Sequence, residues 1–307
     1  MNYLPEGCIY NSQENQKSIA SESGLRNSMI SGTDIEVKAV SCSSEHDIIV
    51  EFQFGKGIIP RKEGAIGIAD GTTRDIALIS RVNKIVRCKV ISMSQHSDGT
   101  INAVLSRKAS QDECVRNYIR YLRVGDIIPA KVTHIEHFGA FVDIGCGLPS
   151  LIPIDAISVS RISDPSDRFT IGQMIKAAVK RIENDRVYLT HKELLGTWEQ
   201  NTERFNIGET VSGIVRSIEE YGIFVELAPN LAGLAEPKEG VSVGDRVSVY
   251  IKSIIKEKMK VKLIIVDTCG TDENSEKPIE YFVESDHIDK WEFSPSVCAK
   301  AIRTVFR

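Results

Sequence analysis

The sequence predicts an all-β protein with helical linkers, built from three tandem five-stranded barrels and a small α/β appendage at the C-terminal end. One block occurs twice, at 125–144 and at 208–227. It contains a glycine-acid turn, a strand-like alternation of apolar residues, and an aromatic-Gly-x-Phe sequence that opens a second strand. A weaker copy without the aromatic residues lies upstream, at 32–108. Copies that recur about every 80–90 residues indicate separate domains on one chain.

The expected boundaries follow the apolar periodicity and the turn residues. After the first copy, Cys114, Tyr118 and Leu122 fall on one side of a helix. The C-terminal end combines four aromatic residues with a helical pattern from Ser296 to Phe306, which favours a small packed unit. The expected segments are an N-terminal extension (1–30), a degenerate barrel (31–108), a linker helix (109–122), a barrel (123–192), a second linker helix (193–206), a barrel (207–267), and a linker with the appendage (268–307).

The first copy has the strands of a barrel but lacks the aromatic residues on its outer face. Its second strand places Ile48, Val50 and Phe52 inward, because side chains alternate across a strand. His46 and Ile49 occupy the positions of the two aromatic residues in the other copies. Five short strands with a longer connection after the third match the small Greek-key OB barrel. The remaining strands are expected at Ile35, Val37 and Val40, at 57–60, at 84–92 and at 100–106, with an Asp98-Gly99 hairpin turn before the last.

In the second and third copies, two aromatic residues point away from the barrel core. Phe141 and Phe224 each lie between two apolar residues whose side chains point to the other face of the strand, and that face is expected to be the core. A glycine precedes each strand and predicts a bulge that turns Phe138 and Tyr221 onto the same outer face. Such pairs offer flat surfaces on which nucleic-acid bases can stack.

Composition limits the classes of protein that fit. The net charge is −4, from 38 Lys and Arg against 42 Asp and Glu, so a basic stripe rather than a basic domain would have to bind phosphates. Seven scattered cysteines without a Cys-x-x-Cys pair argue against a zinc ribbon or a disulfide framework, and for a reducing compartment. No apolar run approaches the roughly 18 residues of a membrane span. We therefore expect a cytoplasmic protein without membrane contact.

The sequence contains no catalytic constellation. The glycine-rich segment 64–71 lacks the Lys-Ser/Thr ending of a phosphate-binding loop. His134 and His137 have a spacing that suits a metal, but no other His or Cys completes a set. We expect no enzyme activity, no small-molecule substrate, no metal and no cofactor.

Four stretches of the second copy resemble the S1 RNA-binding domain family, which is named after ribosomal protein S1 of bacteria: 124–126, 138–143, 148–152 and 186–192. The resemblance covers about 32–267 as three copies, and their tandem arrangement resembles a short, divergent form of the ribosomal array. It implies that RNA lies across strands two, three and five of a barrel. There the family uses two aromatic residues, a histidine ending strand three, an acid in the last hairpin, and an Arg or Lys opening strand five.

In this chain, the resemblance assigns Phe138, Phe141 and Arg186 to RNA contacts, with Glu183 in the place of the acid. Lys260 stands at the Arg position of the third copy. The positions of the family histidine hold Pro60, Pro153 and Glu236. With the outward residues and the rim lysines included, the expected RNA-contacting residues are Phe138, Phe141, Arg186, Tyr188, Lys131, Lys180, Glu183, Tyr221, Phe224, Lys256, Lys258, Lys260 and Lys262.

The sequence therefore predicts a non-enzymatic protein that binds single-stranded, messenger-like RNA and acts in translation at the small ribosomal subunit. The second barrel is expected to supply most of the affinity, the third to add to it, and the first to serve docking or structure. Two alternatives remain: a transcription or RNA-turnover factor that uses the same barrels, and a protein-interaction adaptor. Aromatic residues exposed beside Lys and Arg support RNA binding, whereas Phe141 and Phe224 packed under helices support the adaptor.

Overall fold

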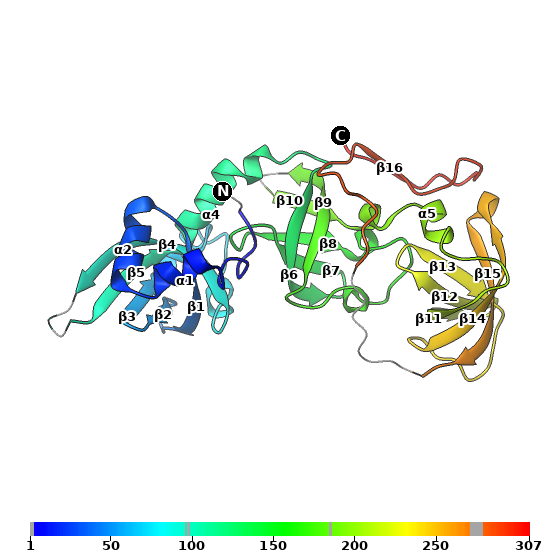
Figure 1. The fold of residues 1–307 in the computed structure, drawn as a ribbon, viewed down its shortest axis with the longest axis horizontal. Helices are drawn as coiled ribbons and strands as arrows, with labels where there is room; N and C mark the ends of the chain where they lie inside the picture. Colours follow the sequence, from blue (N-terminus) through cyan, green and yellow to red (C-terminus); the bar gives the residue numbers. More distant parts are fainter. Residues whose placement is uncertain (1–2, 96, 98, 184–185, 271–278) are drawn as a thin grey trace. The chain divides into compact units, whose positions relative to one another are not determined.

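The computed structural model describes residues 3–95, 97, 99–183, 186–270 and 279–307. It contains three closed five-stranded barrels, which confirms the all-β tandem architecture (Figure 1). The chain divides into two compact units, one formed by residues 1–122 with 143–149 and the other by residues 123–142 with 150–307. The first barrel belongs to unit 1, and most of the second barrel and all of the third belong to unit 2.

The first barrel has the strand order β1-β2-β3-β5-β4, with β3 and β5 parallel and the other neighbours antiparallel. Its inner face holds Ile35, Val37 and Ala39, whereas Val40 of the same strand is 41% exposed. The period of two explains this, because it places Ala39 inward and Val40 outward. Asp98 of the expected hairpin turn lies outside the described residues. The strands are β1 (Ile35–Cys42), β2 (Ile48–Phe52), β3 (Gly55–Ile59), β4 (Ile85–Gln95) and β5 (Ile101–Ser106).

The N-terminal segment is part of this barrel domain and not a separate extension. Its helices are α1 (Gln13–Ile19) and α2 (Glu22–Ser31). Leu25 of α2 is fully buried in the core of the first barrel. The serines of this segment make its helical pattern weak, but two of them are N-caps. The hydroxyls of Ser12 and Ser21 accept hydrogen bonds from backbone N–H groups of the first helical turns.

Helices also fill the connections of unit 1. The long connection after β3 contains η1 (Arg61–Glu63) and α3 (Ile76–Ile79). The expected linker helix at 109–122 is α4 (Arg107–Asn117) followed by η2 (Ile119–Tyr121). It begins earlier than expected because the Ser106 hydroxyl caps it by accepting from the Ala109 N–H.

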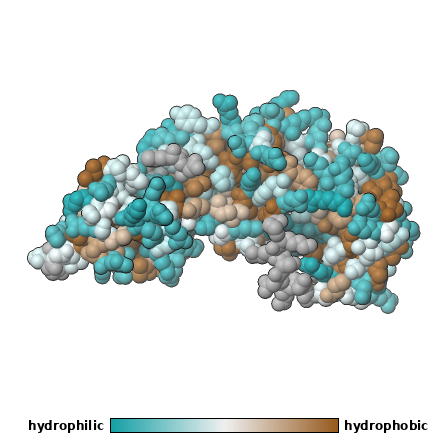
Figure 2. Space-filling view, in the orientation of Figure 1, coloured by the Kyte–Doolittle hydropathy of each residue, from teal (hydrophilic) through white to brown (hydrophobic). Residues whose placement is uncertain are grey.

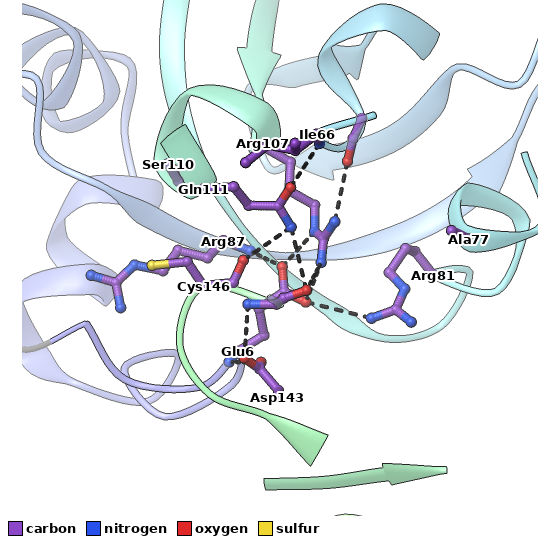
Figure 3. A network of polar contacts seen from close by, with 12 residues as sticks. Glu6, Ile66, Ala77, Arg81, Arg87, Arg107, Ser110, Gln111, Asp143 and Cys146 are labelled. Carbon is purple, nitrogen blue, oxygen red and sulfur yellow. Dashed lines mark hydrogen bonds and ion pairs between the residues drawn. The ribbon is translucent and has the colours of Figure 1, made fainter. Parts of the chain in front are cut away.

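A buried polar network ties α4 to the N-terminal segment and to the 143–149 loop within unit 1 (Figure 3). The Glu6 carboxylate accepts from Arg107 Nε at 2.6 Å and Nη2 at 3.0 Å, and its backbone N–H donates to Asp143 Oδ2 at 2.7 Å. Arg107 also donates to the carbonyls of Gly64 and Gly147. Gly147 has φ of +74°, and a Cβ there would lie 1.9 Å from Arg107 Nη2, so only glycine fits.

Unit 2 repeats the barrel topology. The second barrel has the order β10-β8-β7-β6-β9, and the third has the order β11-β12-β13-β15-β14. Asn184 and Asp185 of the expected last hairpin of the second barrel lie outside the described residues. The strands are β6 (Ile127–Glu136), β7 (Gly139–Asp143), β8 (Pro149–Pro153), β9 (Met174–Glu183), β10 (Arg186–Thr190), β11 (Thr210–Glu219), β12 (Gly222–Ala228), β13 (Leu231–Ala235), β14 (Arg246–Ile255) and β15 (Lys260–Thr268).

The second and third barrels contact each other through charged residues. Arg216 of β11 holds Glu226 through Nε at 2.9 Å and Asp167 through Nη1 at 2.8 Å. Arg168 also pairs with Glu226. Short 3₁₀ segments of this unit include η3 (Ile154–Ala156), η4 (Pro165–Asp167) and η6 (Lys256–Lys258).

The expected linker helix at 193–206 is broken into η5 (Lys192–Leu195) and α5 (Trp198–Thr202). Gly196 makes the break with φ of +83°. A Cβ at this position would also approach the Phe282 ring to 2.8 Å. Thr197 then starts α5 with a reciprocal capping box to Gln200.

The expected helix at 296–306 is wrong. Within residues 279–307, all of them described, the secondary structure is the antiparallel pair β16 (Lys290–Glu292) and β17 (Arg303–Val305). The chain turns back after Pro295, so that the Phe293 N–H donates to the Ile302 carbonyl at 2.9 Å. Trp291 and Phe293 are buried in the core of the third barrel, and Phe306 packs with the second. The C-terminal segment therefore completes unit 2 and is not an α/β appendage.

Candidate nucleic-acid interface

The second barrel presents an aromatic pair beside β7. Phe138 lies in the turn before the strand and is 53% exposed, and Phe141 is half-buried on the outer face. Their ring centroids are 6.0 Å apart at an interplanar angle of 87°. The alternation of side chains along β7 turns Phe141 outward, and the Phe141 backbone carbonyl accepts a hydrogen bond from the Thr133 hydroxyl at 3.1 Å. The pair leaves ring surface open to solvent.

The outer face continues across two more strands. Tyr188 of β10 is aligned with Leu151 of β8, and β8 lies next to β7 in the barrel. Phe141, Leu151 and Tyr188 are all half-buried between buried neighbours. These three residues form an outward row on adjacent strands, which is the surface that the S1 resemblance implies.

Charged residues border the row at the β9–β10 hairpin. Arg186 opens β10 and is exposed, and Glu183 ends β9 opposite it. Arg181 stacks on the Tyr188 ring at 4.2 Å and contacts Glu183 at 3.2 Å. Lys180 is exposed on β9, and Lys131 is half-buried on β6.

Arg181 is a site residue that the sequence reasoning missed. The sequence contained the information that places it. If Arg186 pairs with Glu183 in the hairpin, then two residues further along each strand Arg181 pairs with Tyr188. Cross-strand partners on one face contact each other, and a guanidinium over a ring is a favourable case.

The third barrel repeats the arrangement with a different third member. Tyr221 is 68% exposed, Phe224 is half-buried, and their ring centroids are 6.1 Å apart at 89°. Phe224 is aligned with Leu234 of β13, and Leu234 is aligned with Lys262 of β15. Lys262 therefore occupies the place that Tyr188 has in the second barrel.

The lysines at 256–262 divide into two groups. Lys260 and Lys262 point outward from β15, between the buried Val261 and Leu263. Lys256 and Lys258 lie in η6, and Lys256 is 3.5 Å from Glu199. Beyond the lysines, the outward residues of β15 become aliphatic, and Figure 2 shows hydrophobic surface over this part of unit 2.

In the third barrel, the expected bulge at the glycine is wrong in position, because Gly222 is in register with Glu219 of β11. The irregularity lies in the partner strand β11, between Val215 and Ser217, opposite Val225 and Phe224. Tyr221 reaches the outer face because it lies in the turn before β12, where parity does not constrain it.

The first barrel has an aliphatic row in the matching place. Ile49 is aligned with Ile58 of β3, and Ile58 with Val104 of β5, and all three are half-buried. His46 lies in the turn before β2 with φ of +66°.

Two histidines near the second barrel have different surroundings. His191 is buried beyond β10, where burial lowers its pKa to about 4 and its Nδ1 lies 3.0 Å from the Ile157 carbonyl oxygen. His134 pairs with Glu136 at 2.7 Å. In the described part of the chain, no three His, Cys, Asp or Glu gather as a metal-binding group, and no helix is long and apolar enough to cross a membrane.

Comparison with known proteins agrees with this geometry. The small ribosomal subunit protein bS1 of Staphylococcus haemolyticus is 33% identical over 118 residues, which are 36% of this chain and 29% of that protein. The polyribonucleotide nucleotidyltransferase of Shouchella clausii is 31% identical over 128 residues, which are 40% of this chain and 18% of that protein. The chain thus spans less than a third of the length of either relative.

Among solved structures, a multidomain protein with nucleic acid binding domains from Streptococcus pneumoniae aligns at 13% identity and a TM-score of 0.25, over 76% of this chain and 73% of that one. The model of the S1 RNA binding domain family matches residues 121–192, which contain the second barrel and its aromatic row. This segment, and with it the second barrel, is thus similar to the S1 RNA binding domain family.

Proposed function

We propose that this protein binds single-stranded RNA through the outer faces of its second and third barrels and acts in translation in association with the ribosome. The observation that carries the proposal is the repeated outward row, Phe141–Leu151–Tyr188 and Phe224–Leu234–Lys262, with an exposed aromatic residue before each. Unstacked bases gain about 1–3 kcal/mol each from such rings, and cations at the border neutralise phosphates.

The division of labour is part of the proposal. The second barrel combines two aromatic rings, a stacked tyrosine-arginine pair and Arg186, so it supplies most of the affinity. The third barrel adds its own ring pair and lysines. Linked sites raise the overall affinity through effective concentration, so each site can be weak alone. The aliphatic row of the first barrel offers no stacking surface and suits docking.

The ribosomal assignment follows the similarity to protein bS1 and is tested separately from RNA binding. The full-length protein should co-sediment with small ribosomal subunits, and competition with an unstructured RNA should reduce this. The similarity to a polyribonucleotide nucleotidyltransferase favours RNA turnover as the second candidate. RNA binding without ribosome association would support that candidate.

Salt dependence should report the number of phosphate contacts. Arg186 with one or two rim lysines, and two or three of the lysines at 258–262, give about four to six contacts and a slope of log affinity against log salt of roughly −3 to −4. Replacing Lys258, Lys260 and Lys262 by alanine should flatten the slope by about 1–2 and weaken all sequences alike. Fluorescence anisotropy titrations at several salt concentrations would measure this.

A matched triple variant controls for the loss of charge. Lys38, Lys56 and Lys62 are exposed lysines of the first barrel domain, away from the proposed faces. Their replacement should leave the slope nearly unchanged. Equal salt slopes for the two triple variants would show that Lys258, Lys260 and Lys262 face only solvent and do not contact RNA phosphates.

A further inference from the structure

A cleft of about 480 Å³ lies beside the aromatic pair of the third barrel. Tyr221 and Phe224 form part of its lining, together with Lys258 of η6. Its volume is within the range of small-ligand sites. The third barrel therefore combines its stacking surface with a hollow.

The C-terminal segment supplies another part of the cleft lining. Phe293, Lys300 and Ile302 line it, and so does Trp198 of α5. The segment is fixed there by backbone hydrogen bonds, from Trp198 N–H to the Phe293 carbonyl at 3.0 Å and from Phe293 N–H to the Ile302 carbonyl at 2.9 Å. This part of the lining lies outside the five strands of the barrel, because Trp198 precedes them and the other three residues follow them.

The charge of the cleft favours an anion. Arg161, Lys258 and Lys300 line it and are exposed, against one acidic residue, Glu219. Arg216 also lines the cleft, but its guanidinium already forms ion pairs with Glu226 and Asp167. A cationic border around aromatic rings suits a phosphate attached to a flat base.

A buried hydroxyl in the wall lacks a partner. Ser160 is 7% exposed and lines the cleft, and its Oγ has no hydrogen bond to any described residue. Neighbouring Asn230, by contrast, uses both ends of its amide, with the Val159 N–H and with the carbonyls of Lys192 and Gly196. A buried polar group without a protein partner is costly, and a partner from outside the protein, such as a water, an ion or a ligand, would remove that cost.

We propose that this cleft holds one nucleotide of a single-stranded RNA, with its base against Tyr221 and Phe224 and its phosphate facing Lys258 and Lys300. Ser160 donates or accepts a hydrogen bond to the nucleotide. The C-terminal segment is thereby part of the RNA site. The inference rests on the proposed RNA-binding function and gives the third barrel a recessed site beside its aromatic pair.

The test uses the full-length chain with Phe138→Ala and Phe141→Ala, so that the third barrel dominates binding, and an unstructured RNA of about 12 nucleotides. Adding Ser160→Ala should weaken binding about fivefold without lowering thermal stability, because the hydroxyl makes no bond within the protein. Adding Lys300→Ala should weaken binding about threefold and flatten the salt slope by about 0.7. Lys290→Ala is the matched control, since Lys290 belongs to the same segment but contacts Glu292 outside the cleft.

The outcomes separate the two proposals. Absence of RNA binding by the wild-type protein would overturn both. RNA binding by the wild type that vanishes in the double-aromatic background, or Ser160 and Lys300 variants that behave like Lys290→Ala, would overturn the cleft and leave the proposed function standing. A Ser160→Ala variant that loses stability would also contradict the cleft, because it would reveal an internal partner for the hydroxyl.

Discussion

Replacing Phe138 and Phe141 together by alanine should weaken binding to an unstructured RNA by roughly 2–5 kcal/mol, which is the stacking energy of about two bases. Phe138 is 53% exposed and Phe141 is half-buried on an outer face, so the barrel should stay folded. Anisotropy titration with the full-length protein measures the affinity, and circular dichroism checks the fold.

Tyr121 provides the matched control for removing an aromatic ring. It is 74% exposed in η2 and lies outside both proposed faces. Tyr121→Ala should leave RNA affinity within experimental error. If the double variant unfolds, or if its affinity equals that of Tyr121→Ala, the ring pair is structural and the adaptor hypothesis gains support.

The outer faces could be predicted because strand parity is a local property. Once Val142 is assigned to the core, Phe141 must face outward, and the same argument applies to Phe224. Phe138 and Tyr221 lie in turns, where strand parity does not fix their exposure, and the expected bulge at Gly222 was the wrong reason for the position of Tyr221. Arg181 was within reach, since only cross-strand counting was needed.

The two ends of the chain could not be predicted because their structure depends on distant partners. Leu25 is one apolar residue in a polar segment, and only the first barrel explains its burial. Residues after Pro295 have helical spacing, yet Trp291 and Phe293 gain more by packing into the third barrel, which sets the path of the chain. The cleft followed from this packing and had no signal in the local sequence.

Arg107→Ala should lower the free energy of opening of unit 1 by about 3–5 kcal/mol, because it removes the closest cationic partner of the buried Glu6 carboxylate and leaves it with Arg81 at 3.5 Å and the Arg87 backbone N–H at 3.1 Å. Arg107 is 3% exposed and Glu6 is 6% exposed (Figure 3). Both tryptophans, Trp198 and Trp291, lie in unit 2, so fluorescence does not report on unit 1. Hydrogen exchange of unit 1 peptides, measured by mass spectrometry, does.

Arg116→Ala is the matched control, since Arg116 is exposed on the same helix. It should change the opening free energy by less than about 0.5 kcal/mol. Equal losses for the two variants would contradict a special role of the buried pair. The double variant with Glu6→Leu and Arg107→Met should be less destabilised than Arg107→Ala, because it leaves no buried carboxylate of Glu6 unpaired.

The loss in Arg107→Ala should also depend on pH. In the wild type, burial opposes ionisation of Glu6, but the charge and hydrogen bonds of Arg107 outweigh it and lower its pKa, so its contribution to stability is lost only as the pH falls through that lowered value. Burial and the charge of Glu6 raise the pKa of Asp143 to about 6, so ionising Asp143 costs stability as the pH rises towards and through that value.

Without Arg107, burial should raise the pKa of Glu6 as well, and the folded variant would then recover stability by binding protons as the pH falls. The deficit relative to the wild type should therefore be smaller at about pH 5 than at about pH 8, after correction for intrinsic exchange rates. A deficit that stays constant between these values would mean that lost packing, and not an uncompensated carboxylate, is what destabilises the variant.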